Sequence, residues 1–330
     1  MRIGLSCDLK DALTAKPGEP DDTLEEYDSR KTVEIIAAAL RAKGHTVAML
    51  GGGSEFLDNI RSNKVDFVFN IAEGRGSYRS REAQVPSILE MLDIPYTGSD
   101  PQTLAICLDK PLTKKLAASF GVSTPKWLAI NNKYELTQVD WKTIPFPAII
   151  KPAYEGSSKG IHLTSLANNT SEAKHEVSRL LDAYRQPVMV EEFIDGDEIT
   201  VGMVGNSSPG IVGVMRVIPR KKADHFIYSV EVKRDYVNLV DYECPARLGR
   251  DVMERISADS LKLFKGLECR DFARLDFRIS SNGVPYFLEV NPLPGLGTYS
   301  DLVIMAIMMG WTHEKLIGAV FEAALERSLQ

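Results

Sequence analysis

The chain has 330 residues, 44% of them hydrophobic and 25% charged, and a formal net charge of -6. This length predicts about two domains with a sizeable core, and the acidic balance disfavours a nucleic-acid-binding protein, which needs a basic surface. The longest apolar run, Leu302 to Trp311, is too short to span a bilayer and predicts a buried helix rather than a membrane protein. Four cysteines without a CxxC pair, and an N-terminus that turns polar too soon for a signal peptide, predict a cytoplasmic protein with reduced thiols.

The first hundred residues alternate between strand and helix patterns. Helical spacing from Thr32 to Lys43 ends at Gly44, and a short helix is expected after Ser54. Such alternation is typical of a parallel sheet with helices on its faces. Residues 1–100 are therefore expected to form an N-terminal α/β domain, with strands at Arg2–Cys7, His45–Leu50 and Val65–Ile71.

The rest of the chain has an α+β pattern. One helix is expected over Pro101–Phe120 and another over about Ser171–Ala183, and His225–Asp241 is expected to be a long loop. We predict a central unit over residues 101–186 and a C-terminal unit over 187–330, which ends in a helix (Arg250–Lys265), a hairpin and closing helices. The strands expected before that helix are Pro147–Lys151, Gly160–Thr164, Pro187–Ile194, Glu198–Val204 and Ile211–Ile218.

The hairpin formed by Ala273–Ser280 and Pro285–Asn291 carries polar residues on one face. With Asn282-Gly283 at the turn, Asp276 lies opposite Glu289. Two opposed carboxylates repel each other, and a bound cation would relieve that repulsion. Oxygen ligands of this kind suit Mg²⁺. A solvated sheet face with charges in register by chance explains the hairpin alone equally well.

Two further patterns point to phosphate chemistry. A strand ending at Lys151 leads into the small polar loop Gly156-Ser-Ser-Lys-Gly160, whose backbone N–H groups and hydroxyls could cradle phosphate oxygens. It lacks the Walker A spacing, and alone an ordinary turn explains it better. The run from Val188 to Glu198 is a strand that ends in acids.

In this order, the motifs resemble the ATP-grasp superfamily, specifically proteins similar to D-alanine–D-alanine ligase. The resemblance covers nearly the whole chain and implies an ATP-grasp fold, in which ATP binds between the central and C-terminal units. It implies a cytoplasmic ATP-dependent carbon–nitrogen ligase that forms an amide through an acyl phosphate, with ATP and Mg²⁺ (or Mn²⁺) as cofactors. The matching segments are Pro95–Ser99, Asp109-Lys110, Lys151-Pro152, Gly156–Ser158, Glu191–Glu198, Arg274–Asp276 and Glu289–Gly295.

The resemblance also implies a role for each matching residue. Asp276, Glu289 and Asn291 would hold two Mg²⁺ ions. Arg274 would stabilise the acyl phosphate and the later oxyanion, and Glu26 would bind the substrate amine, although that alignment slides by a residue or two. Contacts to ATP are implied for Lys110, Lys151, Ser157, Ser158 and Lys233 at the phosphates, for Glu191, Glu192 and Ile194 at adenine, and for Glu198 at ribose. Gly295 and Ser300 would lie near the acceptor, with Ser157 in the loop that closes over the reaction.

Departures from the family pattern fall on the substrate side. The segment from Asn70 to Gln84 lacks the family's His-Gly-x-x-Gly-Glu-Asp-Gly stretch and contains three arginines. We predict that Arg81 binds a second carboxylate, on the substrate or on an acceptor peptide, whereas a solvated loop is favoured for Arg75 and Arg79. Arg234 replaces a usual tyrosine, and Asp301 stands where an apolar residue is usual.

Three functions are compared on these grounds. The first is an amino acid or peptide ligase, using either D-alanine or a different pair, in specialised metabolism or wall-peptide synthesis; relatives suggest a homodimer. The second is an ATP-binding module without catalysis, which would not need Arg274 together with the metal ligands. The third is an NAD-type dehydrogenase, whose phosphate-binding fingerprint is missing.

Overall fold

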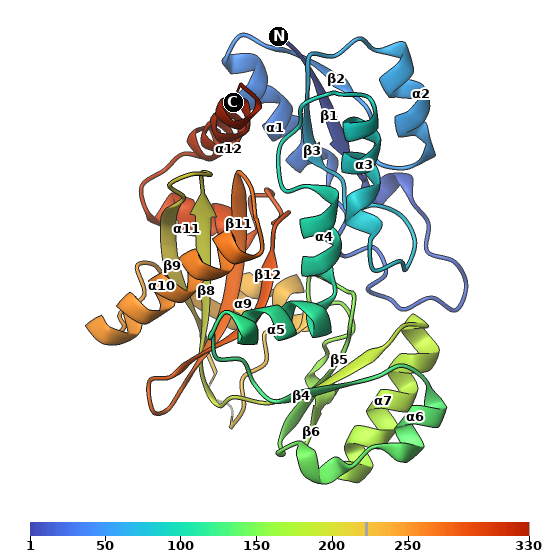
Figure 1. Cartoon of the computed structure of the whole chain (residues 1–330), viewed down its shortest axis with the longest axis vertical. Helices are drawn as coiled ribbons and strands as arrows, with labels where there is room; N and C mark the ends of the chain where they lie inside the picture. The colour runs from blue at the N-terminus through green and yellow to red at the C-terminus, as the bar shows by residue number, and fades with distance from the viewer. Residues whose placement is uncertain (222–223, 330) are drawn as a thin grey trace.

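The structure is a computed structural model that describes residues 1–221 and 224–329, and within these residues the named strands form three separate sheets. One sheet belongs to the N-terminal region and is parallel, and the other two are antiparallel (Figure 1). The mixed α/β and α+β class predicted from the sequence is thus confirmed.

The N-terminal sheet has β1 (Arg2–Cys7) between β2 (Thr46–Met49) and β3 (Phe67–Ile71). Side chains alternate between its faces. On one face the strands pack against α1 (Arg30–Ala42) and α12 (His313–Ser328), the last helix of the chain. On the other face they pack against α2 (Ser54–Ser62) and α3 (Gln84–Met91). The C-terminal helix therefore covers the N-terminal sheet, as Figure 1 shows.

The smaller antiparallel sheet has the strand order β4-β7-β5-β6. Helices α6 (Lys133–Gln138) and α7 (Thr170–Tyr184) pack beside it. Its strands are β4 (Trp127–Ile130), β5 (Ala148–Pro152), β6 (Leu166–Ala167) and β7 (Val188–Glu192).

The strand predicted over Gly160–Thr164 is wrong. Gly160, the first residue of this range, has a φ angle of 74°, which an extended strand does not allow, and Ser157 and Ser158 before it have φ angles of 49° and 62°. The chain instead makes two tight turns and a short 3-10 helix, Leu163–Ser165, before β6.

The larger antiparallel sheet has the order β10-β9-β8-β11-β12. Helix α10 (Arg250–Gly266) packs on one face and α11 (Asp301–Met308) on the other. Close approach of α11 depends on Gly202 of β8, where an added Cβ would lie 2.5 Å from Leu302. The strands are β8 (Gly196–Val204), β9 (Gly210–Pro219), β10 (Val240–Glu243), β11 (Phe272–Ser280) and β12 (Pro285–Asn291).

The single helix predicted over Pro101–Phe120 is two helices, α4 (Pro101–Leu108) and α5 (Lys110–Ser119). Asp109 between them has ψ 85°, and its side chain caps α5 by accepting from the Leu112 N–H at 3.1 Å. Pro111 lacks an N–H group and is tolerated only in the first turn of a helix. The break delivers Lys110 to the start of α5.

The long loop predicted over His225–Asp241 is also wrong. It contains α8 (Val230–Arg234) and α9 (Tyr236–Leu239) and the first residues of β10. Ser229 caps α8, and burial of Val230 and Val232 anchors it.

The buried helix predicted within Leu302 to Trp311 is confirmed as α11, where Leu302, Val303, Met305 and Ala306 are buried. In the described part of the chain no single helix is long and apolar enough to cross a membrane. Helices α11 and α12 taken together have the length and composition of a membrane span, but the two helices are bent by 111° relative to each other.

Candidate active site

The β11–β12 hairpin brings the predicted metal ligands together. Asp276 pairs with Glu289, and Arg274 with Asn291, as predicted. The turn, however, has an odd number of residues, because Ile279 pairs with Pro285. A bulge beyond Asp276 restores the expected register. The opposed carboxylates are therefore confirmed, whereas the two-residue turn used to predict them is wrong.

Each carboxylate of this pair has basic or polar partners. Asp276 accepts hydrogen bonds from Thr200 Oγ1 at 2.6 Å, Arg274 Nε at 3.0 Å and Asn291 Nδ2 at 3.1 Å. Glu289 forms an ion pair with Lys110 at 3.2 Å. Burial by itself raises the pKa of Glu289, but Lys110 and the lysines behind it outweigh burial and hold that pKa well below its usual range. Glu289 is therefore ionised at neutral pH.

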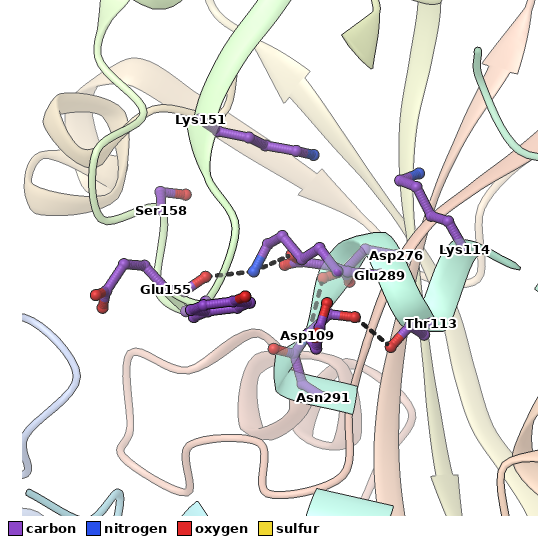
Figure 2. Close-up of polar contacts among 12 residues, drawn as sticks. Asp109, Thr113, Lys114, Lys151, Glu155, Ser158, Asp276, Glu289 and Asn291 are labelled. Atoms are coloured by element: carbon purple, nitrogen blue, oxygen red, sulfur yellow. Dashed lines mark hydrogen bonds and ion pairs between the residues drawn. The ribbon is translucent and has the colours of Figure 1, made fainter. Parts of the chain in front are cut away.

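The donor chemistry of this face fits a hard divalent cation. Asp276, Glu289 and Asn291 supply oxygen atoms from two adjacent strands, and Figure 2 shows the three side chains close together. Residues 1–221 and 224–329 contain no group of three or more His, Cys, Asp or Glu side chains placed to hold a metal ion. This is expected for Mg²⁺, which is usually held by one or two carboxylates while substrate phosphates and water complete its shell.

A chain of buried charges lies beside the hairpin. Lys151 of β5 and Lys114 of α5 both form ion pairs with Glu191 of β7, and all three side chains are buried. In Figure 2 the Lys151 and Lys114 side chains reach toward the same region from different elements. Burial raises the pKa of Glu191, but the two lysines outweigh it and the pKa is lowered overall. Burial also lowers the pKa of Lys114 to about 8.

A pocket lies between the two antiparallel sheets. Its polar wall contains Lys151 and Glu198, and Arg278 Nη1 donates to Glu198 Oε2 at 2.8 Å. Three of the residues implied for adenine, Glu191, Glu192 and Ile194, line it as well. Its apolar wall is made by Ile149, Ile161, Phe193, Ile194, Ile227 and Leu288.

The predicted phosphate loop, Gly156–Gly160, contacts the segment before α8. The Ser158 hydroxyl donates to the carbonyl of Tyr228 at 2.8 Å, so this loop and the segment before α8 are joined. Lys233 of α8 lies 5.0 Å from the Tyr228 ring and lines the same cavity as Asp276 and Glu289. Ser157 lines the adjoining cavity together with Arg274.

Glu26 and Arg81 pair with each other, and Glu26 also lines the cavity that contains Arg274. Arg81 Nη2 donates to both oxygens of Glu26, at 2.8 and 2.9 Å, and lies 3.3 Å from Glu155. Lys159 forms ion pairs with the same two carboxylates. The arginine is 2% exposed. The substrate carboxylate expected for Arg81 stays a prediction, because in this structure the protein's own carboxylates bind its guanidinium.

The other arginines predicted on the substrate side also bind carboxylates of the chain. Arg75 lies 2.8 Å from Asp8, and Arg79, which is 65% exposed, lies 3.3 Å from Asp109. Arg234 pairs with Glu25 at 2.8 Å, and so joins α8 to the N-terminal loop.

Gly295 and Ser300 both line the cavity beside Arg274. A Cβ added at Gly295 would lie 2.9 Å from the Ser300 hydroxyl, so that position requires glycine or a shift of Ser300. The neighbouring Asp301 lies 3.7 Å from Arg274 and accepts from the Tyr228 hydroxyl at 3.0 Å.

Sequence reasoning missed two site residues that the structure reveals. Lys114 lies one helical turn after Lys110, so an i, i+4 reading of α5 would have placed both on one face. Arg278 shares the polar face of β11 with Arg274 and Asp276, and the same alternation pointed to it.

Known proteins resemble this chain along most of its length. A family model described as D-ala D-ala ligase C-terminus matches residues 116–322. The D-alanine–D-alanine ligase of Aquifex aeolicus is 34% identical over 88% of this chain and 94% of its own length. An uncharacterised protein y4sG of Sinorhizobium fredii is 30% identical over 99% of this chain and 98% of its own length. The crystal structure of D-alanine–D-alanine ligase from Bacillus anthracis complexed with ATP has a TM-score of 0.73 and 25% identity, and it covers 100% of this chain and 99% of its own.

Proposed function

The chain belongs to the D-alanine–D-alanine ligase family and is an ATP-dependent ligase, and from this premise we propose that it joins a carboxylate to an amine through an acyl phosphate on the face of the β11–β12 hairpin. The observation that carries the proposal is the pairing of Asp276 with Glu289 across that hairpin, with Arg274 and Lys110 in direct contact with them. A protein that only binds a nucleotide has no need of this arrangement. The substrates we propose are small amino acids or peptides.

ATP is proposed to bind in the pocket between the two antiparallel sheets. The apolar side chains there suit a base, and Glu198, held by Arg278, would accept from the ribose hydroxyls. Glu191, Glu192 and Ile194 lie where the base would contact the backbone of the connection between the sheets. The phosphates would then reach Lys151, Lys110 and Lys233 above the hairpin.

Transfer of the phosphoryl group requires neutralisation of its charge. Asp276, Glu289 and Asn291 would hold Mg²⁺, which supplies positive charge at the transferred oxygens when it is bound. Lys110 and Lys151 add fixed positive charge, and Ser157 and Ser158 line the cavities beside Arg274 and Asp276. The carboxylate of the first substrate becomes an acyl phosphate and so gains a leaving group.

Attack by the amine of the second substrate produces a tetrahedral oxyanion. Arg274 is the cation placed for it, since its guanidinium lines the cavity that also contains Ser157 and Gly295. Contact of the phosphate loop with Tyr228, and of Arg234 with Glu25, excludes water that would hydrolyse the intermediate. Collapse of the oxyanion releases phosphate and leaves the amide.

The proposal is tested by phosphate release from ATP and Mg²⁺ across a matrix of D- and L-amino acids, with products identified by mass spectrometry. We expect release that depends on the added amino acids and a product heavier by one amide linkage. Tight ATP binding without turnover for any pair, dipeptide acceptors included, would contradict the ligase proposal. The homodimer and the cytoplasmic location expected from the family stay predictions.

A further inference from the structure

Three carboxylates on the N-terminal side of the reaction cavity make no ion pair or side-chain hydrogen bond within residues 1–221 and 224–329. They are Asp28 before α1, Glu73 after β3 and Glu82 before α3, and we call them the acidic wall. All three line the cavity that contains Arg274 and Ser157. Asp28 is 9% exposed and Glu82 is 8% exposed, yet their oxygen atoms are not among the fully enclosed unpaired atoms of the described chain. They therefore reach into the cavity rather than into the protein interior.

The cations nearby are already matched by other carboxylates. Arg81 and Lys159 bind Glu26 and Glu155. On the opposite wall, Lys110 binds Glu289 and Arg274 binds Asp276. The described residues therefore supply no cationic partner for the three carboxyl groups of the acidic wall.

Burial, as the largest cause, raises the pKa of Asp28 and of Glu82 to about 7. A buried carboxylate without a partner is unfavourable, and a bound cation would relieve this.

We propose that the carboxylate-donating substrate bears a second cationic group, an ammonium or guanidinium on its side chain, which binds the acidic wall while its carboxylate faces Arg274 and Ser157. The inference rests on the proposed ligase function and names the substrate class of the same site. An alanine side chain would place a methyl group against these carboxylates and leave them unpaired, which selects against it.

The first experiment measures kcat/KM for matched donors that differ only in the terminal group, in both enantiomers: norleucine against lysine, norvaline against ornithine, and 2-aminobutyrate against 2,4-diaminobutyrate. Each is tested with the same panel of acceptors. We expect the cationic member of at least one pair to be preferred by roughly 10-fold or more, the scale of a hydrogen bond to a charged group. Turnover that is equal within every pair, or that favours the neutral members, overturns the proposal and leaves the ligase function standing.

The second experiment uses variants of the acidic wall. Glu82→Gln and Glu73→Gln should each reduce the preference for the cationic donor, while KM for ATP stays the same. Glu34→Gln is the matched control, because Glu34 is an exposed glutamate on α1 that pairs only with Arg41. A preference unchanged in both wall variants would contradict the proposal.

A binding measurement separates this inference from the proposed function. Calorimetric titration of lysine and of norleucine into the protein, with a non-hydrolysable ATP analogue and Mg²⁺, does not require turnover. Tighter binding of lysine that Glu82→Gln abolishes supports the acidic wall even if no pair of substrates is ligated. Equal affinity for the two ligands overturns it.

Discussion

The two walls of the reaction cavity differ in how their charges are balanced. On the hairpin wall, Asp276 and Glu289 each contact a cation of the protein, Arg274 or Lys110. On the N-terminal wall, Asp28, Glu73 and Glu82 contact none in the described chain. A wall balanced within the protein suits a reaction step that is common to the whole family. On the N-terminal wall, where three carboxyl groups have no cationic partner, we propose that the substrate is selected.

The largest effect is expected on the hairpin wall. Glu289→Gln keeps the shape of the side chain and removes one negative charge from the proposed metal site. We expect turnover of ATP to fall by roughly 1000-fold, the scale of losing one group that stabilises transition-state charge, with thermal unfolding close to that of the native chain. Phosphate release and circular dichroism measure the two quantities. A variant with near-full activity would refute the metal assignment.

Substitution of Arg81 tests the buried ion pairs that Arg81 and Lys159 form with Glu26 and Glu155. Arg81→Met leaves Glu26 and Glu155 buried with Lys159 as their only cation, and breaking a buried ion pair costs about 3–5 kcal/mol of unfolding free energy. The exposed Arg79→Met is the control and should change stability by less than about 1 kcal/mol. Denaturant unfolding measures both. Normal stability together with a raised KM for one amino acid would return Arg81 to the substrate role predicted from the sequence.

Substitution of Lys114 tests the buried ion pairs that Glu191 forms with Lys114 and Lys151 beside the proposed nucleotide pocket. Lys114→Met leaves Glu191 paired with Lys151 alone, so we expect a loss near the lower end of the same range, about 3 kcal/mol, and a raised KM for ATP. Lys115→Met, at the next and exposed position of α5, is the control. If Lys114 acts only as packing, stability falls without any change in the KM for ATP. Lys114→Arg, which retains the positive charge, should recover part of that KM.

The smallest effect concerns pH. Burial raises the pKa of Glu82 to about 7, so the folded chain holds this proton at pH values where the unfolded chain has lost it. Stability therefore falls as the pH rises from the ordinary carboxyl range through about 7. Glu82→Gln cannot lose a proton and should flatten this fall, as measured by unfolding at pH 5 and pH 8 without ligand. A pH profile that is the same in both proteins would contradict the raised pKa.

Much of the site was predictable because its signals are local. Alternation along β11 and β12 placed Arg274, Asp276, Glu289 and Asn291 on one face, and that face exists. The predicted two-residue turn was wrong. The turn has an odd number of residues, and the bulge after Asp276 shifts the register back, so Asp276 still pairs with Glu289. The break at Asp109 was also readable, since an aspartate cap followed by Lys-Pro ends one helix and begins another.

Other features depended on contacts between distant segments. Periodicity could not exclude a strand at Gly160–Thr164, because the turn there is held by contacts with distant segments, such as the Gly160 N–H with Asp22 and the Ser158 hydroxyl with Tyr228. The sequence predicted substrate binding for Arg81, and only the fold showed Glu26 and Glu155 at its guanidinium.

By itself, the sequence determined the fold class, the family and the reacting face of the hairpin, because strand alternation and motif order are properties of neighbouring residues. Only the tertiary structure decided which charges are matched. Asp28, Glu73 and Glu82 come from separate segments around the N-terminal sheet, and nothing in their local sequence shows that they share one cavity with Arg274. Whether a charge is balanced depends on which groups surround it in space, and groups from distant segments become neighbours only when the chain folds.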